Sequence, residues 1–244
     1  MVQKSQKSFL HTTFVSLGHR PQETEHQHMQ KKSLVLILIT AWIGVQPFMA
    51  HALSAQTLTF ETHAAFFSRE TNQLKAIDPH VYLADSQVAA GTGPQNIVHA
   101  AKFRPAFISD DTSTPVFNAQ GALLGFTLSS WLGAKGDVTI KPTDGGAAEI
   151  TAEFSGLRPG GIYSLFENHF DQKPIGFTPL DGQGRTNSFT ADTKGSAQIE
   201  VQTPKMPTNV NAILLVYHSD GMSHGETRGE IGVTAHHQLI AKVQ

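Results

Sequence analysis

The sequence predicts an all-β protein: an antiparallel, Greek-key-like β-sandwich that follows a cleaved signal peptide. Three observations predict this fold. Polar and apolar residues alternate along short segments such as 147–154 and 196–201, which is the period of a half-buried strand. Clusters of glycine and proline separate these segments, as they do in sandwiches and barrels. Near the N-terminus, an apolar run behind two lysines has the pattern of a leader.

The leader comes first in the chain. Lys31 and Lys32 precede an apolar run over residues 34–45, a proline then breaks the run, and a small-x-small sequence ends at Ala52. This pattern predicts a signal peptide over residues 29–52, cleaved after Ala52, and a periplasmic or secreted product. The run is shorter than the roughly 20 residues that span a bilayer. We therefore expect no membrane anchor after cleavage.

The rest of the chain divides into three further parts. Residues 1–28 are polar and lack apolar periodicity, and Met29 is a natural start for the leader. We interpret them as a mis-annotated or disordered extension. Residues 53–113 are expected to form irregular strands and loops packed on the main domain. Residues 114–244 are expected to form the β-sandwich domain.

Within the last two parts, each strand is predicted from its local pattern. Residues 212–217 form a continuous apolar run, which is typical of a central strand covered on both faces. Residues 231–243 read as the closing strand, with room for a bulge. A short helix is expected between 64 and 75. The other expected strands cover residues 58–62, 81–83, 147–154, 162–166 and 196–201.

Composition excludes several classes of function. The chain of 244 residues contains no cysteine, so a disulfide, a thiolate metal site and a cysteine nucleophile are all impossible. A formal net charge of −2 without a basic stripe argues against nucleic acid as a partner. The sequence has no Gly-x-Ser-x-Gly elbow and no phosphate-binding loop. These absences favour a non-catalytic binding or structural module, with an envelope or extracellular protein as a possible partner.

Histidines near the C-terminus are the candidate chemistry. A loop leaves the apolar strand 212–217, and two adjacent histidines stand on the following strand. Neutral imidazoles and carboxylates together suit Zn or Cu. Because neighbours on a strand point to opposite faces, one of the two adjacent histidines should join such a site. The candidate metal ligands are His218, Asp220, His224, His236, His237, His169 and Glu167.

Three other interpretations stay open. Ser219, Asp220 and Gly221 also form a good turn sequence, and the histidines lack a diagnostic metal-binding spacing. If the cluster does hold a metal, an open coordination position would indicate a redox or hydrolytic metalloenzyme. Alternatively, an edge strand from the 53–113 region could bind a protein partner.

One segment resembles a known fold. Residues 149–160, Glu-Ile-Thr-Ala-Glu-Phe-Ser-Gly-Leu-Arg-Pro-Gly, resemble the strand and Gly-Leu-x-Pro-Gly turn of the copper/zinc superoxide dismutase fold, and they are similar to chordin-type sandwich repeats. Residues 190–197 resemble the same folds. The resemblance implies a Greek-key-like sandwich. The dismutase His-x-His copper motif falls on Leu165 and Glu167 here, so the resemblance transfers no copper ligand.

Overall fold

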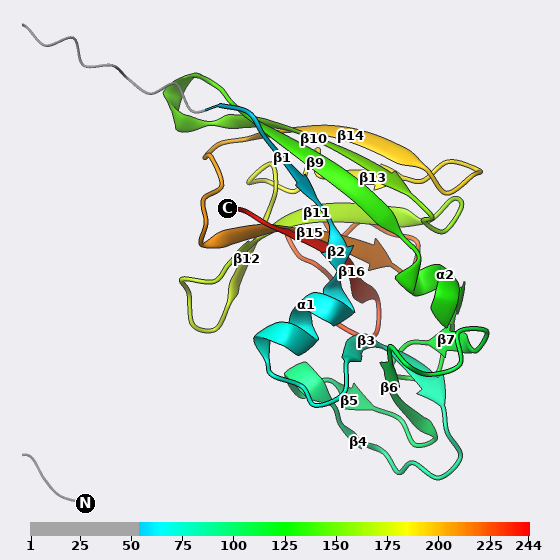
Figure 1. Ribbon diagram of the computed structural model, residues 1–244. Coiled ribbons are helices and arrows are strands. Elements are labelled where there is room, and N and C mark those ends of the chain that lie inside the picture. Colours follow the sequence, from blue (N-terminus) through cyan, green and yellow to red (C-terminus); the bar gives the residue numbers. More distant parts are fainter. Residues whose placement is uncertain (1–53) are drawn as a thin grey trace, which may run out of the picture. The chain divides into compact units, whose positions relative to one another are not determined.

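The computed structural model describes residues 54–244 (Figure 1). Of these residues, 45% lie in strands and 10% in helices, and the paired strands are antiparallel. The prediction of an antiparallel all-β protein is confirmed. The predicted leader and the residues upstream of it lie outside the described residues. Neither helix of the described part, α1 (His63–Glu70) or α2 (Leu128–Leu132), has the length and hydropathy that a membrane-crossing helix requires.

The first sheet contains four strands in the order β1-β9-β10-β14. Their bounds are β1 (Gln56–Thr59), β9 (Lys135–Pro142), β10 (Ala148–Ser155) and β14 (Ala197–Thr203). In β10, buried Ile150, Ala152 and Phe154 alternate with less buried polar residues. Ile150 lies opposite Ile140 of β9 and Val201 of β14. The alternation predicted from the sequence therefore lines one face of this sheet with apolar side chains.

The second sheet has the order β12-β11-β15-β16-β2, and β13 also pairs with β11. Every residue of β15 is buried, as expected of a central strand covered on both faces. The bounds are β2 (Glu61–Thr62), β11 (Ile162–His169), β12 (Gly176–Pro179), β13 (Ser188–Thr190), β15 (Asn211–His218) and β16 (Ala235–Lys242).

The main core joins these two sheets. It brings Val138, Ile150 and Val201 of the first sheet together with Leu215 and Leu239 of the second. The opposite face of the second sheet carries a separate apolar cluster. That cluster contains Phe66 of α1 together with residues of β11, β15 and β16, so helix α1 covers this outer face (Figure 1).

A third sheet and a small ladder complete the fold. The third sheet has the order β6-β3-β7-β8, with β3 (Ile77–Ala84), β6 (Phe103–Phe107), β7 (Pro115–Phe117) and β8 (Leu123–Thr127). The predicted domain division at residue 114 thus falls inside one sheet. The ladder pairs β4 (Gly91–Thr92) with β5 (Val98–His99). Two short 3-10 helices are η1 (Pro94–Asn96) and η2 (Asp144–Gly146).

A bulge interrupts the pairing of β15 with β16. Leu239 lies opposite Leu215, but the next pair along is His237 with Val216, which leaves Gln238 without an opposite residue. Such an extra residue shifts the alternation of side chains along the strand. As a result, Leu239 and His236 face the main core, whereas His237 faces the outer side that α1 covers.

Candidate metal centre

Three buried histidines from three different elements meet on the outer face of the second sheet. His63 is the first residue of α1, His80 lies in β3 and His237 lies in β16. One ring nitrogen of each lies within 4.8 Å of those of the other two. The rings of His63 and His80 stack with centroids 4.8 Å apart, and His237 meets His80 edge-on at 4.0 Å. We call these three residues the histidine cluster.

The position of His63 follows from the start of the helix. The hydroxyl of Thr62 accepts a hydrogen bond from the backbone N–H of Ala65 and so caps α1. Thr62 also pairs with Leu239 in β16. The cap therefore fixes the first helical residue close to the strand that carries His237.

His80 is held by hydrogen bonds on both ring nitrogens. Its Nδ1 accepts from the backbone N–H of His237 at 2.8 Å, and its Nε2 lies 2.9 Å from Oε1 of Gln95. Because Nδ1 accepts, Nε2 must carry the proton that it donates to Gln95. Gln95 has a φ of 57°, which is an uncommon conformation for a residue with a side chain.

The other two histidines each leave one nitrogen free. Nδ1 of His63 and Nδ1 of His237 are buried and have no hydrogen-bond partner among residues 54–244. Nε2 of His237 accepts a hydrogen bond from Nη1 of Arg228 at 3.0 Å. Buried polar atoms are nearly always paired, so these two nitrogens of one cluster are available to a further partner.

The cluster is electrically neutral at pH 7. Burial, together with the positive charge of the nearby Arg228, lowers the pKa of His63 to about 3. Burial also lowers the pKa of His80 and of His237 well below the usual value, and the neighbouring histidines act in the same direction. Neutral imidazoles keep a lone pair, which is the form that binds metals.

This donor set fits a transition-metal ion of the Zn or Cu type. Zn–N bonds of about 2.0–2.1 Å place the ligand nitrogens of a tetrahedral site roughly 3.3 Å apart. The three rings would therefore draw together around the ion. His80 has both ring nitrogens in hydrogen bonds and would exchange one of them for a metal bond. His237 could bind a metal through its unpaired Nδ1 only in the tautomer that gives up the hydrogen bond from Arg228.

A cavity of about 650 Å³ adjoins the cluster, with His63 and His237 in its wall. Helix α1, η1, the end of β11, β12 with the segment before it, and the loop around Arg228 contribute the rest of the lining. A metal bound by three histidines would therefore have an adjacent space for a fourth ligand. The lining residues are His63, Phe66, Phe67, Glu70, Thr71, Gln95, Asn168, Phe170, Pro174, Ile175, Phe177, Arg228 and His237.

Of the seven metal ligands predicted from the sequence, His237 belongs to the cluster. Its neighbour His236 faces the main core, as the expected opposite orientation of adjacent strand residues requires. Nδ1 of His236 donates to the backbone oxygen of His80 at 2.8 Å, and its Nε2 lies 3.0 Å from Oγ of Ser219. His236 therefore supports the strand that carries His80.

The loop residues lie apart from the cluster. Nε2 of His224 lies 2.9 Å from Oδ2 of Asp220, and the ring of His224 lies 5.2 Å from that of His218. Nε2 of His218 lies 2.8 Å from Oγ of Ser164. Metal binding by these residues stays a prediction.

His169 and Glu167 stand further along β11. The ring nitrogens of His169 lie 2.9 Å from Oγ1 of Thr178 and 3.1 Å from Nδ2 of Asn211. Burial raises the pKa of Glu167 to about 7, against the opposing effect of Lys205. Their predicted role as metal ligands also stays a prediction.

Sequence reasoning missed His63 and His80. Both fall in the region that we expected to be irregular, and 156 residues or more separate them from His236 and His237. The sequence signal for each was a histidine directly before an apolar run: His63 precedes residues 64–67, and His80 precedes residues 81–83. The pairing of β2 with β16 and the contact of β3 with β16 could not be read from such a local pattern.

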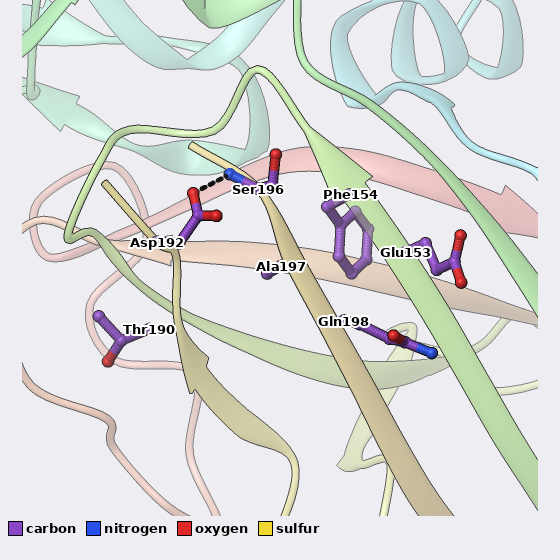
Figure 2. A pocket seen from close by; sticks show the side chains of 7 residues that line it. All are labelled: Glu153, Phe154, Thr190, Asp192, Ser196, Ala197 and Gln198. Atoms are coloured by element: carbon purple, nitrogen blue, oxygen red, sulfur yellow. Dashed lines mark hydrogen bonds between the residues drawn. The ribbon is translucent and has the colours of Figure 1, made fainter. Parts of the chain in front are cut away.

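Another hollow in the surface offers less chemistry. It has about 520 Å³ and lies beside β10, β13 and β14 (Figure 2). Asp192 in its wall accepts the backbone N–H of Ser196 at 2.8 Å and so belongs to a turn. No histidine lines this hollow. We therefore place the functional site at the histidine cluster.

Comparison of the sequence with models of known protein families gives no match, and comparison with curated protein sequences gives none either.

Proposed function

We propose that this chain is an exported metal-binding protein in which His63, His80 and His237 hold one Zn or Cu ion. The observation that carries the proposal is the convergence of three buried, neutral imidazoles, two of which leave a buried nitrogen unpaired. An unpaired buried polar atom costs about 1–3 kcal/mol. A metal bond at these nitrogens would remove that cost.

Metal content provides the direct test. The full chain, purified after export, is loaded with Zn²⁺, Cu²⁺ or Co²⁺, freed of excess metal and analysed by plasma mass spectrometry. We expect one ion per chain, together with the visible absorption of four-coordinate Co²⁺ in the cobalt form. His63→Gln and His237→Gln should each weaken binding by 100-fold or more.

His224→Gln is the matched control, because it removes a histidine that lies outside the cluster. This variant should retain one ion per chain. Circular dichroism of each variant checks that the fold persists. Equal metal content in the wild type, His63→Gln and His237→Gln would overturn the proposal, and metal loss in His224→Gln alone would transfer the site to the loop.

A metalloenzyme is the second candidate, and the adjoining cavity favours it. A site with three protein ligands and space for a fourth can hold water or substrate on the metal. Azide added to the cobalt form should then change its absorption spectrum. A spectrum that does not respond to azide would favour a closed, non-catalytic site.

Export and the finer topology belong to the same proposal. Strand β14 lies next to β10 in the first sheet although β11, β12 and β13 of the second sheet come between them in sequence. Such crossing connections support a Greek-key-like sandwich. For export, N-terminal sequencing of the processed protein should begin at Leu53. A product that retains the residues before Ala52 would contradict cleavage at that position.

A further inference from the structure

The cavity beside the histidine cluster is lined by apolar side chains and by the guanidinium group of Arg228. The apolar wall consists of Phe66, Phe67, Phe170, Pro174, Ile175 and Phe177. Arg228 and His237 also line the cavity, and Nη1 of Arg228 contacts Nε2 of His237. Pockets of this size and composition take small organic molecules, and their few polar groups fix the orientation of the ligand.

Arg228 brings a positive charge that no acidic residue balances. Within residues 54–244, no carboxylate oxygen lies within 4.0 Å of its guanidinium nitrogens. Its described contacts are the ring of His237 and the face of Phe177, whose centroid lies 3.2 Å from Cζ. Burial lowers the pKa of Arg228 to about 10, so the group remains a cation at neutral pH.

A half-buried guanidinium with neutral neighbours is suited to bind an anion. Its planar fork of N–H donors matches the two oxygens of a carboxylate. One donor contacts His237, which leaves others for a ligand. Stacking on Phe177 fixes the plane of the fork and so limits the entropy lost on binding.

One acidic residue, Glu70, also lines the cavity, but its side chain is 56% exposed and lies 3.6 Å from Arg69. Arg69 itself pairs more closely with Glu61, at 2.7 Å, and solvent screens the exposed carboxylate of Glu70. Asn168 adds a buried Oδ1 without a partner in the described part of the chain. Because this oxygen is a hydrogen-bond acceptor, the preference of the cavity for a negatively charged group depends on Arg228.

We propose that this cavity binds a small organic carboxylate whose charged group pairs with Arg228 and whose aryl or alkyl part packs against the phenylalanine wall. The inference rests on the proposed function in one respect: a metal on the histidine cluster would offer its open position to one carboxylate oxygen. The pairing with Arg228 and the apolar contacts do not depend on the metal.

Titration calorimetry with 3-phenylpropionate and with its uncharged analogue 3-phenylpropan-1-ol tests the proposal. The wild type, in metal-loaded and chelator-treated forms, should bind the acid at least tenfold more tightly than the alcohol. Arg228→Gln should weaken binding of the acid by tenfold or more and leave binding of the alcohol within twofold. Arg185→Gln is the matched control, because Arg185 is exposed on another loop, and it should bind like the wild type.

The outcomes separate the two proposals. If the chain binds no metal but binds the acid with dependence on Arg228, the carboxylate site stands and the metal proposal fails. If the chain binds metal but Arg228→Gln binds the acid as tightly as the wild type, or if the wild type binds no acid, the carboxylate site is overturned. Arg228→Lys keeps the positive charge but loses the planar fork of donors, so it should bind the acid with an affinity between those of the wild type and Arg228→Gln. This second variant keeps the proposal testable if Arg228→Gln does not fold.

Discussion

At the scale of single residues, Asp181 shows how one carboxylate organises a loop. Its two oxygens accept the backbone N–H groups of Gln183, Gly184, Arg185 and Thr186 at 2.6–3.0 Å. Burial alone would raise the pKa of Asp181, but these four hydrogen bonds outweigh it and lower the pKa to about 2. The ionised carboxylate therefore stabilises the loop that follows β12.

We predict that Asp181→Ala lowers the free energy of unfolding by about 1–2 kcal/mol at pH 7, as for loss of a capping side chain. The folded-state pKa lies below the ordinary value of about 3.9. The contribution of Asp181 is therefore complete above pH 4 and disappears as the pH falls to about 2. Urea unfolding at pH 7 and at pH 3 checks this. Asp144→Ala, at an exposed position, is the control and should have little effect. If wild type and Asp181→Ala differ in the free energy of unfolding by the same amount at pH 7 and at pH 3, the prediction is wrong.

Glu167 should show the opposite pH dependence. Its pKa is raised to about 7 by burial, so the folded protein favours the protonated form. The stability associated with this group is complete below about pH 4.5 and is lost as the pH rises through 7. We predict that Glu167→Gln is more stable than the wild type at pH 8, by about 1 kcal/mol once solvent screening is considered.

The same unfolding measurement at pH 4 should show no gain for Glu167→Gln. Glu200→Gln, on the exposed face of β14, is the control and should not change stability at either pH. A stabilisation of Glu167→Gln that is equal at pH 4 and pH 8 would show that shape, and not charge, is responsible.

For the site residues, sequence reasoning reached one member of the cluster. The adjacent pair His236 and His237 drew attention because it is a conspicuous local pattern, and alternation correctly placed the two side chains on opposite faces. His63 and His80 stand alone in the sequence. Their meeting with His237 depends on long-range strand pairing, which no local pattern encodes.

At the scale of elements, the turn between β13 and β14 depends on a glycine. Gly195 has a φ of 74°, and a Cβ there would lie 2.2 Å from the backbone oxygen of Leu157. Asp192 closes the same turn through the N–H groups of Lys194 and Ser196. The turn therefore packs directly on the loop that follows β10.

We predict that Gly195→Ala lowers the free energy of unfolding by at least about 2 kcal/mol, because it adds a backbone clash to the strain of a positive φ. Gly145→Ala is a matched control. Gly145 has a φ of 75°, but a Cβ there meets nothing within 4 Å, so this variant should show the strain alone. Thermal unfolding of both variants measures the difference. If both variants lose the same free energy of unfolding, the backbone around Leu157 accommodates the added Cβ without an energetic penalty.

Strands with clear alternation were predictable, and strands without it were not. Predictions at 147–154 and 212–217 match β10 and β15 to within one residue at each end. Strand β9 was missed although Gly136, Val138 and Ile140 alternate with polar residues. In the third sheet, the strand predicted at 81–83 lies within β3. Strands β6, β7 and β8 were missed because they have five residues or fewer and β6 contains Pro105, which breaks the usual strand pattern. The predicted helix over 64–75 ends at Glu70, and Asn72 has a φ of 52°.

At the scale of the whole molecule, a metal on the histidine cluster would connect distant parts of the chain. His63 belongs to helix α1, which covers the outer face of the second sheet. His80 belongs to β3 of the third sheet, and His237 belongs to β16 of the second sheet. A ligand that binds only the folded state adds stability according to its concentration and affinity. The whole fold should therefore respond to metal.

We predict that Zn²⁺ at 100 times its dissociation constant adds about 2.7 kcal/mol of stability and raises Tm by roughly 5–10 °C for a domain of this size. Differential scanning calorimetry with and without metal measures the shift, and a chelator should reverse it. His237→Gln should show no shift. An equal shift in His237→Gln would mean that the stabilising ion binds elsewhere.

Gln238 of β16 has no opposite residue in β15, so deleting it should have a different effect from deleting any other residue of the strand. Removing one residue from an ordinary strand turns every side chain beyond it to the other face. Removing Gln238 would instead restore regular pairing, with His237 still opposite Val216 and Leu239 still opposite Leu215. A shortened chain lacking residue 238 should therefore keep the proposed metal site, whereas one lacking Ile240 should lose both this site and the fold. The deletion would remove the hydrogen bond from Nε2 of Gln238 to the backbone oxygen of Trp131, so we expect some loss of stability without a change in the face that His237 occupies.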